Sequence, residues 1–488
     1  MKKISRREVL TSGAAGLATL AWRNEVRAAA ADGQGPVVLN DASRLNPTPV
    51  AKHVIVRPDD RERLVAELRA LLAEASRSGD GVCLGGARHS MGGQSLLRNG
   101  IAVSLDKPHV EVDAARKICR VRAGARWRDV LGALDPLGLS VAVMQSNSDF
   151  SVGGTLCVNA HGWPVPCAPF GATVQSFRLM LADGAVLTCS RNENAELFGH
   201  AIGGYGLFGI VLDIDMTVVS NATMLPRYDI VPAGDVARRF LEAARDPQAA
   251  MAYGRLSVAR EHFLEEGLVV SYRTDAAAGD RAPAARPSQA YSMVSRALFR
   301  AQIGSERGKK ARWHAETRLL PPAARKHPIT RNAILGYPVS VLAERRRNRT
   351  DILHEYFLPA DRFADFLEAC RARIPPSLDL LNVTLRYVDT DIDSTLSYAP
   401  APRIAAVMLF NQPATQEADE RMRRVTEPLI DAALSFGGSY YLPYRLHARP
   451  AQFRAAYPGF SQFAAAKRRY DPQLRFRNAL WDVYLATA

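Results

Sequence analysis

The chain has 488 residues, of which 47% are hydrophobic and 23% charged, and its formal net charge at pH 7 is +14. This length exceeds the usual size of one domain and allows a large core without disulfides or metals, so we expect two domains. Few aromatic residues are interspersed among the basic ones and no nucleic-acid motif occurs, so we attribute the charge to solubility or to attraction towards anionic envelope surfaces. We expect no nucleic-acid partner. The six cysteines show no CxxC or zinc-type spacing, so we predict buried free thiols and no metal site.

Residues 1–30 have the features of an export signal. A Lys-Lys pair precedes the twin-arginine pattern Ser5-Arg6-Arg7, a mildly apolar stretch covers 9–22, and small residues follow at 28–30. An ordinary Sec signal, or a basic amphipathic start to the fold, would share some of these features. We predict a twin-arginine signal peptide over 1–30, the twin-arginine export machinery as a partner, and a periplasmic or secreted location.

The segment that follows alternates short strands with a few helices. Leucines at helical spacing predict a helix over 61–79, and a second helix is expected over 127–136. Apolar-rich strands are expected over 81–84, 101–105, 118–121, 177–181, 186–188 and 210–219. This pattern is typical of an α+β fold rather than a regular succession of βαβ units. We assign residues 31–222 to this first domain.

Residues 85–94, Gly-Gly-Ala-Arg-His-Ser-Met-Gly-Gly-Gln, form a glycine-rich turn directly after a predicted strand. Glycines adopt backbone conformations closed to other residues and have no Cβ, so consecutive N–H groups can converge on an anion. That geometry suits a diphosphate, and His89 would lie beside whatever the diphosphate carries. The alternative is a surface turn with an incidental histidine.

A second glycine cluster contains Gly204-x-Gly206-x-x-Gly209, the spacing of a dinucleotide-binding fingerprint. The Rossmann fingerprint requires a strand before it, a helix at it and an acidic residue about 20 positions later. A strand is predicted after this cluster, and Asp213 and Asp215 come too early. The sequence therefore does not predict an NAD site here, and the glycines more simply allow close approach to another ligand.

The pattern changes at about residue 223. A run rich in Lys and Arg extends over 296–349, which we interpret as a solvated face. Strands are expected over 354–359 and 382–388, and helices over 361–372 and 417–435. We assign residues 223–449 to a cap or substrate domain, and residues 450–488 to a segment that completes the first domain.

Several motifs occur in an order that resembles the flavin domain of the vanillyl-alcohol oxidase family. After the turn at 85–94 come Val152-Gly153-Gly154-Thr155, Val158-Asn159-Ala160-His161-Gly162 and the run 202–211. Near the end of the chain stand Tyr457-Pro458 and Phe476-Arg477-Asn478. The motifs are most similar to those of cytokinin dehydrogenases and of alditol and aldonolactone oxidases. The resemblance implies a PCMH-type FAD-binding domain of two α/β subdomains with an inserted α+β cap.

The resemblance also implies where FAD binds. His89 matches the histidine that is bonded covalently to the flavin 8α carbon in some members, although it could instead only hydrogen-bond the diphosphate loop, as in non-covalent relatives. His161 is expected to be either a flavin-facing donor or a packed residue. The remaining cofactor contacts implied are Gly85, Gly86, Ser90, Gly92, Gly93, Gln94, Gly153, Gly154, Thr155, Asn159, Gly162, Gly204, Ile210, Val211 and Asn478.

The catalytic residues are implied less directly. Arg386 matches the arginine of a Glu-x-Arg pair in alditol oxidases, but Thr384 stands where that glutamate is expected. Glu355, on a neighbouring predicted strand, would supply the missing carboxylate if it points inward rather than to solvent. Tyr444 and His447 lie in a stretch that resembles a Tyr-Leu-Pro strand near the flavin, and we expect at least one of its polar residues to face the substrate.

Together these features predict an FAD-dependent oxidoreductase that transfers a hydride from a small alcohol, sugar, lactone or amine to the flavin. Reoxidation by O2 or by a periplasmic electron acceptor remains open at this stage. The alternatives are an arabinono- or gulono-1,4-lactone or alditol oxidase that releases hydrogen peroxide, a dehydrogenase that uses a quinone or protein acceptor, and a flavin-binding protein without catalysis.

Overall fold

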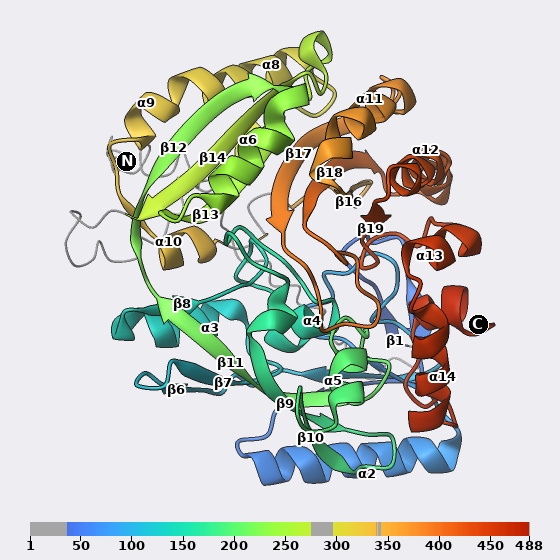
Figure 1. Ribbon diagram of the computed structural model, residues 1–488. Helices are drawn as coiled ribbons and strands as arrows, with labels where there is room; N and C mark the ends of the chain where they lie inside the picture. Colours follow the sequence, from blue (N-terminus) through green and yellow to red (C-terminus); the bar gives the residue numbers. More distant parts are fainter. Residues whose placement is uncertain (1–36, 275–295, 338, 340–342, 488) are drawn as a thin grey trace, which may run out of the picture.

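The computed structural model describes residues 37–274, 296–337, 339 and 343–487 (Figure 1). The predicted signal peptide over 1–30 lies outside these residues. The strands near the bottom of Figure 1 belong to the first part of the chain, and a larger sheet above them belongs to the middle part. Helices and strands alternate irregularly in both parts, so the α+β prediction is confirmed.

A small parallel sheet opens the first part. Its order is β3 (Lys52–Val56), β5 (Ile101–Leu105) and β4 (Val82–Leu84), and a separate pair is formed by β1 (Val37–Leu39) and β2 (Thr48–Val50). Helix α2 (Arg61–Ser78) begins where the Asp60 side chain accepts a hydrogen bond from the N–H of Arg63, and it buries its leucines against this sheet. Since β4 ends at Leu84, its carboxyl end leads directly into the glycine turn at 85–94.

An antiparallel sheet follows, in the order β10-β9-β11-β7-β6 with β8 also paired to β11. Its strands are β6 (Val110–Asp113), β7 (Ile118–Arg122), β8 (Leu139–Val141), β9 (Val174–Met180), β10 (Val186–Ser190) and β11 (Ile210–Ser220). The helices of this part are α3 (Trp127–Leu134), α4 (Val152–Cys157) and α5 (Ala195–Ala201). β11 follows the GxGxxG pattern directly, so that pattern opens no helix, as expected.

The middle part of the chain forms an eight-stranded sheet, which we call the cap sheet. Its order is β15 (Ile329–Thr330), β12 (Thr223–Pro232), β14 (Glu266–Thr274), β13 (Ala249–Leu256), β17 (Asp379–Val388), β18 (Arg403–Pro413), β16 (Arg349–Leu358) and β19 (Ser439–Tyr440). Helices α6 (Ala233–Arg245), α11 (Phe363–Arg373) and α12 (Gln416–Ser435) cover one face (Figure 1). Helices α8 (Glu306–His314), α9 (Pro321–Ala324) and α10 (Arg331–Leu335) complete this part, and residues of α8 line the cavity described below.

The end of the chain returns to the first sheet. It carries α13 (Pro450–Ala456), α14 (Phe460–Tyr470) and a helical turn at Trp481–Leu485, and Phe476 forms a parallel bridge with Val82 of β4. Lys467 is fully buried, and its ammonium group forms an ion pair with Asp471, which also accepts hydrogen bonds from two backbone N–H groups. Because an unpaired buried charge costs several kcal/mol, about 3–5 when one partner is removed, this pair fixes the closing segment in place.

Most sequence-based elements are found within three residues of their predicted limits. The strand expected over 354–359 begins earlier, at Arg349, and two motifs differ in conformation. Gly153-Gly154-Thr155 lies inside helix α4, because Ser151 caps that helix by accepting the N–H of Gly154. The stretch around Tyr444 is a strand only as far as Tyr440 and continues as a loop. All six cysteines are free thiols, four of them buried and two partly buried. Among the described helices, none has the length and apolar character needed to cross a bilayer.

Candidate active site

A cavity of about 830 Å³ lies between the first part of the chain and the cap sheet. Its size falls within the range of roughly 300–1,000 Å³ that small-molecule and cofactor sites occupy. Its walls include the glycine turn, residues 145–163, residues 205–211, the loop 441–444, and strands of the cap sheet with α8. Both parts of the fold therefore contribute to one site.

The glycine turn is held open towards the cavity. The N–H of Gly85 donates to the carbonyl of Val103, and the hydroxyl of Ser104 donates to the carbonyl of Gly85. A Cβ at Gly86 would lie only 2.1 Å from Oγ of Ser151, the residue that caps α4. The backbone at Gly86 thus approaches the start of α4 as closely as only glycine permits.

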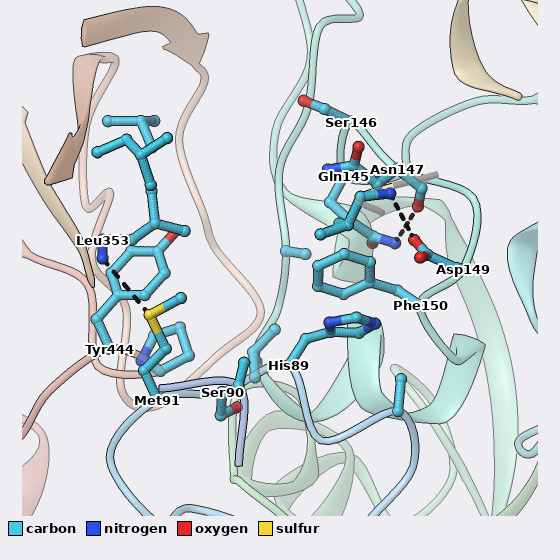
Figure 2. Close-up of a pocket in the computed structure, with 18 of the residues that line it drawn as sticks. His89, Ser90, Met91, Gln145, Ser146, Asn147, Asp149, Phe150, Leu353 and Tyr444 are labelled. Carbon is cyan, nitrogen blue, oxygen red and sulfur yellow. Dashed lines mark hydrogen bonds between the residues drawn. The ribbon is translucent and has the colours of Figure 1, made fainter. Parts of the chain in front are cut away.

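His89 lies in this turn and stacks on Phe150, with ring centroids 4.0 Å apart and an interplanar angle of 23°. Figure 2 shows the two rings face to face, with Asp149 beyond them and Tyr444 on the opposite wall. Burial lowers the pKa of His89, against the opposing charge of Asp149. The imidazole is therefore kept neutral, with a lone pair on one ring nitrogen.

A buried carboxylate, Glu355 of β16, points into the same cavity and is 3% exposed. Its Oε1 lies 2.6 Å from Nε2 of His161, and its Oε2 accepts a hydrogen bond of 3.1 Å from the hydroxyl of Tyr444. Burial, followed by the charge of Glu355, raises the pKa of Tyr444 well above its ordinary value. Tyr444 is therefore a neutral donor, and of the two orientations that the sequence left open for Glu355 the structure shows the inward one.

Arg386 of β17 adds a cation to this wall. Its Nη2 donates to the hydroxyl of Ser146 at 2.8 Å, and its guanidinium lies over the ring of Trp163, 5.2 Å from the centroid. Burial lowers the pKa of Arg386 to about 9, and the charge of Glu355 opposes that shift. The guanidinium remains protonated at neutral pH, so a cation and a carboxylate face the same space.

Many of the predicted site residues line this cavity. They are Gly85, Gly86, His89, Ser90, Gln94, Gly153, Gly154, Thr155, Ile210, Val211, Glu355, Arg386 and Tyr444. Gln94 has a role that differs from the expected diphosphate contact. Its amide NH2 donates to the carbonyls of Leu442 and Tyr444, so it links the glycine turn to the loop that carries Tyr444.

The other predicted residues do not line the cavity, and most support those that do. Asn159 donates to Asp391 and accepts the N–H of Gly171. Asn478 donates to the carbonyl of Tyr205, which does line the cavity. The remaining four glycines have structural roles. Gly162 packs closely against Met144 and Gly204 against His200, and the N–H groups of Gly92 and Gly93 donate to Gln94 and Asp41.

His447 is also absent from the cavity wall. Its Nε2 lies 3.0 Å from Asp419 of α12 and its Nδ1 lies 3.2 Å from the hydroxyl of Thr426. The chain leaves its strand after Tyr440, so the alternation that would have turned His447 towards the flavin does not exist. His447 therefore does not contact the cavity in which the other predicted catalytic residues lie.

Sequence reasoning missed several residues that the structure brings to the cavity. Trp163 and Tyr205 line it, as do Phe150 and Gln145. Gly206, whose close approach to a ligand was expected, lines it too. Gly206 has a left-handed φ of 72°, which glycine favours, so the GxGxxG spacing did carry a signal, although not for NAD. No sequence signal identified Trp163, which meets Arg386 only through the fold.

Unpaired polar atoms indicate that the cavity is built for a polar ligand. Among the described residues, His161 Nδ1, Trp163 Nε1, Tyr228 Oη and Arg88 Nε are buried without a hydrogen-bond partner, and all four residues line the cavity. Buried polar groups without partners are costly, so a bound molecule that pairs with them gains stability. A dinucleotide with a polar ring, as the resemblance implies, meets these requirements. The described residues contain no cluster of three or more metal-ligating side chains.

We expect Gly86→Ala to reduce FAD binding at least tenfold, because the added Cβ would displace Ser151 and close the turn. Gly132→Ala in α3 is the matched control, since a Cβ there meets no atom within 4 Å. The ratio of flavin absorbance to protein after purification measures the effect. Equal FAD content in both variants would contradict this role for the turn.

Comparison with known proteins agrees with this geometry. A family described as FAD binding domain matches residues 53–190. The mouse L-gulonolactone oxidase is 29% identical over 163 residues, 33% of this chain and 37% of that protein. Cytokinin dehydrogenase 2 of Arabidopsis thaliana is 34% identical over 128 residues, 26% of each chain.

A decaprenylphosphoryl-beta-D-ribose oxidase of Mycolicibacterium smegmatis is 30% identical over 176 residues, 34% of this chain and 38% of that protein. The chain thus matches well under half the length of each of these relatives. The glycine turn and the residues that follow it up to β10 fall within the matched family segment. The chain therefore contains a PCMH-type FAD-binding domain, and FAD is its cofactor.

Proposed function

We propose that this protein is an FAD-dependent oxidoreductase that removes a hydride and a proton from a small alcohol, sugar, lactone or amine. The observation that carries the proposal is the buried group of Glu355, His161, Tyr444 and Arg386, which shares one cavity with the glycine turn. Bound FAD supplies the hydride acceptor.

The side chains divide the remaining work. Glu355 is an acceptor for the proton of the substrate hydroxyl or amine, and its hydrogen bonds with His161 and Tyr444 orient its two oxygens. Arg386 stabilises negative charge that develops on the substrate oxygen as the proton leaves. Thr384 stands where alditol oxidases have a glutamate, and we propose that Glu355 takes over the role of that carboxylate.

A second candidate is a lactone or alditol oxidase that releases hydrogen peroxide. The similarity to proteins named L-gulonolactone oxidase and L-galactono-1,4-lactone dehydrogenase favours a lactone as the substrate, and the first of these names favours an oxidase. Peroxide release on aerobic turnover supports the oxidase, whereas its absence indicates a periplasmic quinone or protein acceptor. A flavin that no donor reduces under anaerobic conditions would indicate a flavin-binding protein without catalysis.

Glu355→Gln should lower kcat/KM for the best donor roughly 10²–10⁴-fold, the usual contribution of a positioned general base. Its FAD content should not change. Donors are first found by screening alcohols, sugars, lactones and amines for anaerobic loss of flavin absorbance. Asp215→Asn, which alters a buried carboxylate of β11 outside the cavity, is the control and should retain activity per bound flavin. Full activity of Glu355→Gln would remove the proton-accepting role.

We further propose that FAD is attached covalently through His89. A C–H bond at the flavin 8α carbon is replaced by a C–N bond to the imidazole. The proton goes to solvent and the electron pair to O2 or another acceptor. The neutral, stacked imidazole in the cavity supports this, because its free lone pair can form the bond.

Acid precipitation of the wild-type protein should therefore leave the flavin on the polypeptide, whereas His89→Ala should release it or bind none. His109→Ala, which removes an exposed histidine outside the cavity wall, should behave as wild type. Free flavin in the wild-type supernatant would show that the attachment is non-covalent.

We also propose that residues 1–30 direct twin-arginine export, on the strength of the Ser5-Arg6-Arg7 pattern. Replacing Arg6 and Arg7 by Lys keeps the charge but should leave the full-length protein in the cytoplasm, as cell fractionation would detect. Unimpaired export of the double variant would point to another route.

A further inference from the structure

The cavity continues from Glu355 across the inner face of the cap sheet. Strand pairing places Glu355 of β16 opposite Val407 of β18, Val407 opposite Thr384 of β17, and Thr384 opposite Arg255 of β13. Paired residues point to the same face of a sheet, and all four of these line the cavity. Neighbouring strands are about 4.8 Å apart, so Arg255 lies roughly 14 Å from Glu355 along this row.

A compact charged group stands at the far end of the row. Nη2 of Arg255 lies 3.0 and 3.2 Å from the two carboxylate oxygens of Glu316, and Nε of Arg312 lies 2.8 Å from the first of them. All three side chains are less than one fifth exposed and line the cavity. We call Arg255, Arg312 and Glu316 the distal cluster.

The distal cluster has an excess of positive charge and of hydrogen-bond donors. The guanidinium groups of Arg255 and Arg312 both hydrogen-bond the single carboxylate of Glu316. Nη1 of Arg255 makes only a long contact of 3.4 Å with the hydroxyl of Thr384, although a guanidinium has five N–H donors. Arg312 is held by the carbonyl of Leu381 and by Asn382. Arg255 is therefore the member of the cluster with donors left to offer to the cavity.

The two residues between the ends of the row are Val407, which is apolar, and Thr384, which is polar. Both line the cavity, and the hydroxyl of Thr384 already accepts a hydrogen bond of 2.8 Å from the amide of Asn382. A substrate that extends from Glu355 to Arg255 would therefore carry a polar group at each end. The charged end at Arg255 would favour an anion, since an oxyanion pairs with a guanidinium more strongly than a neutral group does.

We propose that the distal cluster is a binding subsite for a carboxylate or phosphate at the far end of an elongated substrate, whose oxidised carbon lies beside Glu355. The proposal rests on the proposed function and specifies the substrate class. Arg312 and Glu316 belong to the basic run at 296–349, for which a solvated face was expected. The structure buries this pair against the cavity because the helix that carries Arg312 packs over the cap sheet.

Binding to the oxidised holoprotein tests this without turnover. The probes are ω-hydroxy acids and α,ω-diols of equal chain length, from about six to twelve carbons so that some span the roughly 14 Å between the ends. Titration calorimetry should show the best acid binding about tenfold or more tighter than the diol of the same length, the gain expected from one charge-assisted hydrogen bond. Equal affinities, a preference for the diol, or no binding of any acid would overturn the proposal.

Two variants with opposite charge effects separate a binding role from a structural one. Arg255→Gln should abolish the preference for the acid, whereas Glu316→Gln should increase it, because the cluster gains net positive charge. Arg239→Gln, which removes a partly buried arginine paired with Asp229 on the cap, is the matched control and should leave the preference unchanged. If Arg255→Gln and Glu316→Gln change the preference in the same direction, or not at all, the cluster is structural only.

Failure of the two proposals is distinguishable. If no donor reduces the flavin but the acid preference and its dependence on Arg255 persist, the subsite stands and the proposed oxidation is wrong. If donors reduce the flavin but the acid preference is absent, the oxidoreductase stands and the subsite is wrong.

Discussion

The hydrogen bond between Glu355 and His161 is the contact on which the candidate active site depends. Glu355 belongs to the cap sheet and His161 to the segment after α4, so this bond of 2.6 Å joins the two parts of the fold across the cavity. A carboxylate taken out of water is tolerated only when it is paired and hydrogen-bonded. The position of one part relative to the other is therefore coupled to the position of the carboxylate that we propose as the proton acceptor.

The glycine turn imposes a second constraint, this time on the backbone. The turn needs the closing segment of the chain, because β4 before it is paired with Phe476 and Gln94 within it is bonded to the loop that carries Tyr444. The glycine turn is thus bonded both to the loop that carries Tyr444 and, through β4, to the end of the chain.

The cap sheet sets the distances within the cavity. Its strands run side by side at a fixed spacing, so one register row carries Glu355 at one end and Arg255 at the other. Selectivity for the substrate then follows from charges at fixed positions rather than from a flexible loop. Under our proposals, residues of the cap sheet and residues 145–163, which lie within the segment matched by the family, would select the substrate together.

Sequence alone determined the features that depend on local chemistry. The helix at α2 follows from leucine spacing, and the glycine turn with His89 follows from residues adjacent in the chain, whose conformational needs can be recognised without knowing their neighbours. Tertiary structure alone decided which distant side chains meet. His447 was expected at the flavin but pairs with Asp419, whereas Trp163 and Arg255 had no sequence signal and line the cavity. The reason is physical: a backbone turn is specified by its own residues, but a side-chain environment is the sum of contacts from strands hundreds of residues apart.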